Sequence, residues 1–163
     1  GLDKCYEAVI ELGAVTPSFD GETEITERRL FDHVTRADIE HVLQLFTGNI
    51  EQVPPMYSAI KVKGTPLYKL ARRGEELELT PRPVHIENIE LTGLNLPELA
   101  LTIRCSKGTY IRSLAHDIGA ELGCGAYLKS LRRTAVGSYS INDAWQLDAL
   151  VDALQASAPV NRS

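Results

Sequence analysis

The sequence lacks the cysteine pairing and the long apolar runs that mark several common classes of protein. Its three cysteines, Cys5, Cys105 and Cys124, are an odd number and form no C-x-x-C pair. Reduced thiols in a cytoplasmic protein are therefore expected, rather than a disulfide framework. No apolar stretch approaches the roughly 20 residues that a membrane-spanning helix needs, so no membrane partner is expected. The residues after Gly1 do not contain the apolar segment of a secretory signal.

Short motifs for nucleotide, hydrolase and metal chemistry are missing as well. The sequence contains neither G-x-x-x-x-G-K-[ST] nor G-x-G-x-x-G, which excludes the usual nucleotide-binding loops. The absence of G-x-S-x-G argues against a hydrolase built on Ser58 or Ser113. The histidines form no H-E-x-x-H and no zinc-type spacing with the cysteines, so no metal is expected.

The charge is acidic in total but uneven along the chain. The formal net charge is −5, yet residues 1–50 carry ten acidic and four basic side chains, whereas residues 101–163 carry five and seven. The segment Met56–Gly74 contains five cations and no acid. Binding of a polyanion depends on the local field rather than on the sum. These segments are therefore either contact sites for nucleic acid or ordinary solvated faces.

Strand-like and helix-like patterns mix without strict alternation over 163 residues, which favours a single α+β domain. The strands are expected at Cys5–Leu12, Val84–Leu91, Leu99–Cys105 and Thr134–Tyr139. The helices are expected at Arg36–Thr47, Pro66–Arg73, Thr109–Leu122 and Asp143–Leu154, with a helical turn at Ala126–Ser130. Turn and capping residues add a connection at Gly93–Pro97, a capping box of Thr35 with Asp38, and Thr109 as a helix N-cap.

Two longer segments carry most of the functional information. The first reads G-N-I-E-Q-V-P-P-M-Y-S-A-I-K from Gly48 to Lys61 and continues as L-Y-K-L-A-R to Arg72. The second reads C-S-K-G-T-Y-I-R-S-L from Cys105 to Leu114. In the second segment a strand passes through a glycine into a helix whose start carries a tyrosine and an arginine, groups suited to stack on a base and to bind an anion. Core packing and a structural ion pair are the competing interpretation.

These two segments resemble the TruB-type tRNA pseudouridine synthases. Four shorter matches support the resemblance: the K-C-Y strand at Lys4, the Thr16–Gly21 loop, D-I-G at Asp117 and L-R-R-T at Leu131. The resemblance runs from Lys4 to about Tyr139. It implies a mixed, mainly antiparallel sheet flanked by helices, incomplete in this chain. Residues 1–155 would be the C-terminal part of the catalytic domain, and residues 156–163 a tail.

The resemblance implies that the protein isomerises a T-loop uridine (uridine 55) of tRNA to pseudouridine, after flipping the base out of the RNA stack. The family needs no cofactor and no metal, and family precedent is a monomer. Tyr6 would stack on the flipped uracil, Tyr110 would line the same pocket, and Leu131 would be its apolar wall. Arg112 would pair with the catalytic aspartate and keep it ionised.

The resemblance also implies an RNA-binding loop over Pro54–Pro81, which would close over the T-arm of the tRNA. The cations expected to meet phosphates there are Lys61, Lys63, Arg72 and Arg73.

The sequence departs from the family pattern at the catalytic aspartate. The family carries it in a G-H-x-G-T-L-D-P block before the K-x-Y strand, and this sequence contains no such block. Neither Asp20 nor Asp117 is assigned its role. We expect Gly1 to follow a truncation or a nick, with the nucleophile on an upstream segment of the same protein; the family's C-terminal PUA domain is not included either. A buried Arg112 would then lack its partner, and Leu99–Cys105 would face an open sheet edge.

Two alternatives to the enzyme remain open. The chain could be a catalytically inactive RNA-binding module with the same pocket, or a protein-interaction domain whose basic segments are solvated faces. Isomerisation of a T-arm stem-loop separates the enzyme from the inactive module. Salt-dependent RNA binding separates the module from the interaction domain.

Overall fold

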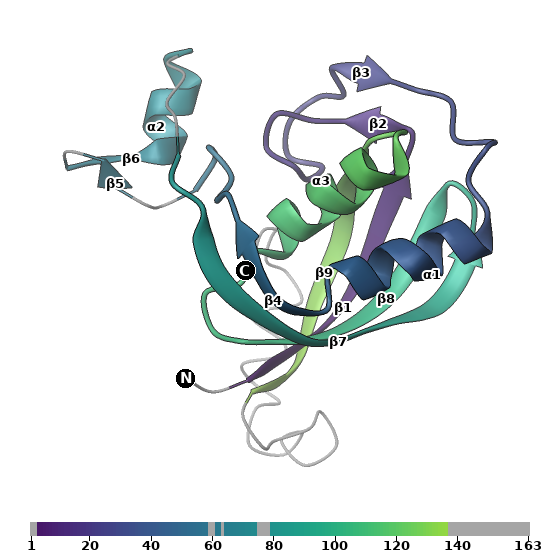
Figure 1. Ribbon diagram of the computed structural model, residues 1–163. Coiled ribbons are helices and arrows are strands. Elements are labelled where there is room, and N and C mark those ends of the chain that lie inside the picture. Colours follow the sequence, from purple (N-terminus) through teal and green to yellow (C-terminus); the bar gives the residue numbers. More distant parts are fainter. Residues whose placement is uncertain (1–2, 59–60, 63, 75–78, 137–163) are drawn as a thin grey trace.

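The computed structural model describes residues 3–58, 61–62, 64–74 and 79–136 (Figure 1). An antiparallel five-stranded sheet in the order β4-β7-β8-β1-β9 forms its centre. Its strands are β1 (Lys4–Leu12), β4 (Gly48–Gln52), β7 (Arg82–Asn95), β8 (Glu98–Cys105) and β9 (Ala126–Val136). The fold is α+β with a mainly antiparallel sheet, which confirms the predicted class.

Three helices and two small two-stranded sheets complete the described part. The helices are α1 (Arg36–Leu45), α2 (Leu67–Arg72) and α3 (Ile111–Leu122). The short strands are β2 (Ala14–Val15) with β3 (Glu27–Arg28), and β5 (Lys61–Val62) with β6 (Thr65–Pro66). Helices α1 and α3 cover one face of the large sheet, whereas β5, β6 and α2 project from one end of it (Figure 1). The predicted helix Asp143–Leu154 and the predicted domain boundary at residue 155 lie outside the described residues.

The core lies between the large sheet and the two covering helices. Strand β1 alternates in the way a half-buried strand must, with Tyr6, Ala8, Ile10 and Leu12 buried. Helix α3 contributes an apolar stripe from Ile111 to Leu122, and both sets belong to one contiguous cluster. A functional group on this face of β1 is therefore held inside a packed core.

The N-terminal ends of α1 and α3 differ in their capping. The Thr35 hydroxyl accepts from the Asp38 N–H at 3.1 Å, and the Asp38 carboxylate accepts from the Thr35 N–H at 3.0 Å. The predicted capping box of α1 is confirmed. The prediction of Thr109 as the cap of α3 is wrong, because Tyr110 occupies that position and its side chain makes no capping bond.

Strand pairing overrides two local predictions. Residues Ala126–Ser130 are not a helical turn but the start of β9, because they pair with Val9–Leu12 of β1. The predicted connection at Gly93–Asn95 instead belongs to β7, which pairs with β8 up to Asn95. The turn is confined to Leu96 and Pro97. The expected open edge at Leu99–Cys105 is also wrong, since β8 is paired on both sides, with β7 and β1.

The end of α3 packs directly on the backbone that leads into β9. A Cβ added to Gly119 would lie 2.2 Å from the Ala126 amide nitrogen and 2.4 Å from the Gly125 carbonyl carbon. The Gly125 N–H donates to the Gly119 carbonyl at 3.0 Å. Helix and strand therefore approach as closely as glycine allows.

We predict that Gly119→Ala destabilises the chain by about 2 kcal/mol or more, because the added methyl meets backbone that cannot move aside. Urea unfolding followed by circular dichroism measures the effect. Gly21→Ala is the control, since a Cβ there meets nothing within 4 Å. Equal stability of the two variants would contradict the packing described.

Asp117 on α3 gives a second stability prediction. Burial raises the pKa of its carboxyl to about 6, so the folded state holds this proton more tightly than the unfolded state does. Stability should fall as pH rises from about 4 to about 6, where only the unfolded carboxyl has already lost its proton. Asp117→Asn should therefore raise the free energy of unfolding at about pH 7 more than at about pH 4.

The control for Asp117→Asn is Asp38→Asn, for which the pH dependence of the change in unfolding free energy should have the opposite sign. Hydrogen bonds from Thr35 lower the pKa of the Asp38 carboxyl. The contribution of the Asp38 carboxylate to stability is present at neutral pH and is lost as the pH falls through its pKa in the folded state. Unfolding curves at the two pH values test both variants. A shift in the same direction for both would overturn these assignments.

Candidate active site

The start of α3 is capped by a side chain from a distant strand. The Oε1 atom of Gln52, at the end of β4, accepts from the Tyr110 N–H at 2.9 Å. The Nε2 atom of the same amide donates to the Tyr110 carbonyl at 3.0 Å. Gln52 is only 2% exposed, so both bonds are shielded from water. The backbone of Tyr110, half-exposed at the helix start, is thereby fixed in place.

The first turn of α3 is bonded to the segment that follows Gln52. Arg112 is 4% exposed, and its Nη1 donates to the Tyr57 carbonyl at 2.6 Å. The Ser113 hydroxyl donates to the Val53 carbonyl at 2.7 Å. The two prolines between these carbonyls prevent the segment from folding as a helix, so its carbonyls stay free to accept side-chain donors. The two sequence segments singled out by their motifs therefore lie against each other.

Asp20 lies beside Arg112, in the loop after β2. Its Oδ2 is 3.9 Å from the Arg112 Nη1, and the residue is completely buried. Its Oδ1 accepts from the Ser18 hydroxyl at 2.5 Å and from the Glu22 N–H at 3.0 Å. The preceding residue, Phe19, has a φ of +68°, and its ring stacks on His116 at a centroid distance of 3.9 Å. The carboxylate is thus held in one orientation by its own loop.

Buried polar atoms at this pair have unused bonding capacity. Within the described part, Asp20 Oδ2 and Arg112 Nε are buried without a hydrogen-bond partner, and so is Ser58 Oγ. Burial lowers the pKa of Arg112, while the Asp20 carboxylate opposes that change. A guanidinium nevertheless stays charged in proteins. The site is therefore a buried cation that can accept a further anionic or hydrogen-bonding group.

The expectation that Arg112 lacks any partner in this chain is corrected by this geometry. Asp20 supplies a carboxylate, although 3.9 Å is too long for a hydrogen bond. The sequence gives Asp20 no predicted role, because it belongs to a different motif from Arg112. The D-G pair in the loop at Thr16–Gly21 was the available signal.

Tyr6 and Leu131 lie on the helix-covered face of the sheet. Tyr6 is 2% exposed within the core cluster, and Leu131 packs against the same cluster. Leu131 pairs with Ala8, two residues along β1 from Tyr6, so the two side chains are diagonal neighbours on one face. Burial raises the pKa of the Tyr6 hydroxyl to about 12, which keeps the phenol protonated at neutral pH.

Three of the four predicted phosphate-binding cations lie in the part that projects from the large sheet. Arg72 and Arg73 are exposed at the end of α2, and the Arg72 guanidinium lies 5.3 Å from the Tyr68 ring centroid. The Tyr68 N–H donates to the Ser58 carbonyl at 2.9 Å, which joins α2 to the segment beside Arg112. Lys61 lies in β5, and Lys63 lies outside the described residues.

Over residues 3–58, 61–62, 64–74 and 79–136, no group of three His, Cys, Asp or Glu side chains is arranged to hold a metal ion. None of the helices in that same part is long and apolar enough to cross a membrane.

Curated relatives of this chain are tRNA-modifying enzymes. It is 49% identical over 149 residues to a "tRNA pseudouridine synthase B" of Opitutus terrae, covering 91% of this chain and 62% of that protein. It is 53% identical over 140 residues to the protein of that name from Dehalococcoides mccartyi strain CBDB1, covering 86% and 47%. The chain thus spans about half the length of the curated relatives it matches.

Solved structures share the fold. The "Crystal Structure of a Cbf5-Nop10-Gar1 Complex" contains a chain that matches with a TM-score of 0.59 at 26% identity, covering 90% of this chain and 38% of that one. A chain of an H/ACA RNP bound to a substrate RNA matches with a TM-score of 0.54 at 23% identity, over 90% of this chain and 36% of that one.

Two family models together account for nearly the whole chain. The model of the TruB family pseudouridylate synthase N-terminal domain matches residues 1–111. The model of the tRNA pseudouridylate synthase B C-terminal domain matches residues 112–161. With the identities above, these matches confirm the resemblance read from the sequence motifs: the chain belongs to the TruB family of pseudouridylate synthases.

Proposed function

We propose that this chain is the part of a tRNA pseudouridine synthase that binds the T-arm and holds the catalytic aspartate in its ionised form. In the proposed reaction the bond between uracil N1 and the ribose C1′ of uridine 55 breaks, and a bond from uracil C5 to C1′ forms. The proton on C5 is released and N1 gains one, so the product is an isomer. The aspartate that assists this step comes from a segment outside this chain.

The observation that carries the proposal is the buried Arg112 with its unused Nε. A carboxylate that approaches this side of the guanidinium would gain a charge-assisted hydrogen bond. An adjacent cation lowers the pKa of a carboxyl, and the effect is larger where water is excluded. Arg112 is therefore suited to keep an incoming aspartate ionised and oriented.

Asp20 is a positioning residue in this proposal. Its carboxylate is fixed by Ser18 and by the Glu22 N–H, and it attracts the Arg112 guanidinium from one side. The Tyr57 carbonyl binds the same guanidinium through Nη1. One hydrogen bond and one nearby fixed carboxylate favour a single orientation of the cation, so that an incoming carboxylate meets it already oriented.

The remaining predicted site residues would bind the RNA. A flipped uracil is expected against Tyr6 and Leu131, with Tyr110 at the entrance. Because Tyr6 is 2% exposed, neighbouring side chains must move before a base can reach its ring. Arg72 and Arg73 are exposed and are suited to contact phosphates, as are Lys61 and Lys63 by their place in the family motif.

The first test is to read the codons upstream of Gly1 and to assay both polypeptides on a T-arm stem-loop tritiated at uridine C5. If a G-T-L-D-P block is encoded there, the longer protein should release tritium. The 163-residue chain should bind the stem-loop but release no tritium. Tritium release by the shorter chain at the same rate would place the nucleophile within this sequence. Binding without release by both would favour the inactive RNA-binding module.

A second test concerns the buried ion pair in the longer, active protein. Asp20→Asn keeps the size of the side chain but removes its charge, so the guanidinium loses its oriented partner. We expect kcat to fall by about tenfold or more with little change in KM. Asp3→Asn is the matched control, because Asp3 pairs with Arg104 at 3.6 Å on the exposed surface.

Tritium release under saturating RNA measures both variants, and thermal unfolding shows whether each remains folded. An unchanged kcat in a folded Asp20→Asn protein would remove Asp20 from the proposed site. Equal losses in the Asp20 and Asp3 variants would point to a general charge effect rather than to positioning.

A further inference from the structure

Strand β9 is irregular at two positions that flank one short segment. Its pairing with β1 shifts between Val9 and Ile10 and again between Cys5 and Tyr6. Lys129 is the extra residue at the first shift, and Thr134 is the extra residue at the second. Each β-bulge changes which face the following side chains occupy, since side chains alternate along a strand. The two bulges therefore fix the faces used by the segment between them.

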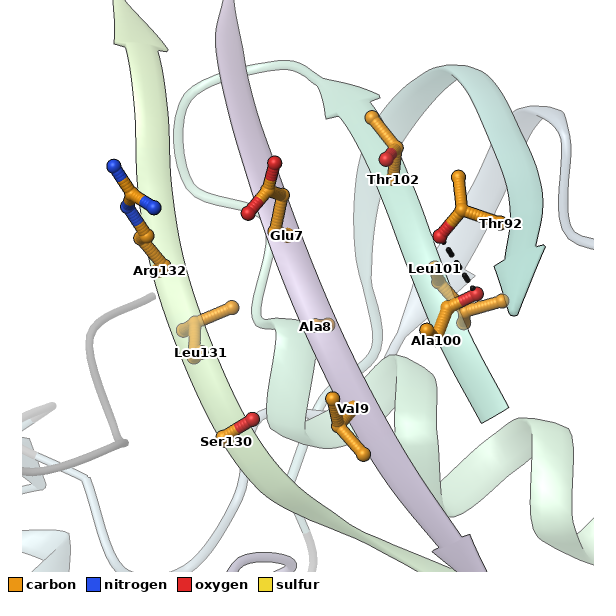
Figure 2. Close-up of a pocket in the computed structure, with 10 residues that line it drawn as sticks. All are labelled: Glu7, Ala8, Val9, Thr92, Ala100, Leu101, Thr102, Ser130, Leu131 and Arg132. Atoms are coloured by element: carbon orange, nitrogen blue, oxygen red, sulfur yellow. Dashed lines mark hydrogen bonds between the residues drawn. The ribbon is translucent and has the colours of Figure 1, made fainter. Parts of the chain in front are cut away.

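Between the bulges, neighbouring arginines point to opposite faces of the sheet. Arg133 pairs with Tyr6, and paired residues of antiparallel strands share a face. Arg132 pairs with Glu7 on the other face. Figure 2 shows Arg132 and Glu7 together at a hollow of about 500 Å³, on the side away from the helices. Arg133 is therefore on the side of Tyr6, and Arg132 is not.

Unlike Lys129 and Arg104, Arg133 has no carboxylate partner among the described residues. Lys129 pairs with Glu98 and lies 3.7 Å from Glu11, and Arg104 pairs with Glu87 at 3.0 Å. Arg133 is exposed. Its charge is close enough to Tyr6 to lower the pKa of the phenol against the larger, opposing effect of burial.

We propose that Arg133 binds a backbone phosphate of the RNA next to the nucleotide whose base enters beside Tyr6. A base can enter an apolar core, but its phosphate stays in water at the rim because burying that charge is costly. Arg133 is an exposed cation at this rim, and its planar guanidinium matches two phosphate oxygens. Since strand β9 lies at an edge of the described sheet, an approaching RNA strand has access to it.

This inference rests on the proposed function, and its test uses binding rather than catalysis. The 163-residue chain is titrated into a fluorescein-labelled T-arm stem-loop at several salt concentrations, and anisotropy gives Kd. We expect Arg133→Gln to raise Kd by about fivefold and to reduce the slope of log Kd against log salt by about one. Arg132→Gln, its neighbour on the opposite face, should change Kd by less than about twofold.

Arg133→Lys adds a second variant that keeps the charge but loses the planar fork. It should retain the wild-type salt slope with a smaller rise in Kd than Arg133→Gln. Equal effects of the Arg132 and Arg133 variants, or no effect of either, would overturn the assignment of Arg133 while leaving RNA binding intact. Absence of salt-dependent binding by the unmodified chain would instead overturn the RNA-binding part of the proposed function, and the Arg133 inference with it.

Discussion

The structure around the candidate site depends on keeping one guanidinium out of water. Arg112 is buried at the start of α3, and isolated burial of a cation is costly unless acceptors surround it. The Tyr57 carbonyl accepts a hydrogen bond from it, and the Asp20 carboxylate lies 3.9 Å away with the opposite charge; the two come from segments far apart in sequence. The segment with Pro54 and Pro55 carries the Tyr57 carbonyl to the guanidinium, and the loop through Phe19 carries Asp20 to it. Removing either group would leave the buried charge with fewer compensating contacts.

Much of the fold was predictable from local pattern. The alternation of β1, the apolar stripe of α3 and the capping box of α1 are each encoded within a few residues. The predictions of secondary structure fail where strand pairing, rather than local sequence, determines the conformation. Ala126–Ser130 has no strong local preference and becomes a strand because β1 offers it an edge. Strand β8 is central rather than at an edge, because it forms a hairpin with β7 on one side and pairs on the other side with β1, which lies far from it in sequence.

The residues of the candidate site could be predicted from the sequence, but the contacts between them could not. Motif resemblance identified Tyr6, Tyr110, Arg112 and Leu131, and the structure shows where each lies. It did not identify Asp20, because the distance between two loops cannot be read from spacing. Likewise, the sequence around Gln52 predicts only a segment interrupted by prolines, although the Gln52 amide bonds both the N–H and the carbonyl of Tyr110. Such reciprocal contacts are a property of the fold and not of either segment alone.

The bulges of β9 explain how an acidic chain can present cations where an anion would approach. With a net charge of −5, long-range attraction to RNA is weak, so binding must depend on local placement. Lys129 and Arg104 are already paired with carboxylates, which leaves their neighbourhoods close to neutral. The bulge at Lys129 sets the alternation so that Arg133, and not Arg132, shares a face with Tyr6. The backbone irregularity thus selects which cation stands beside the buried phenol.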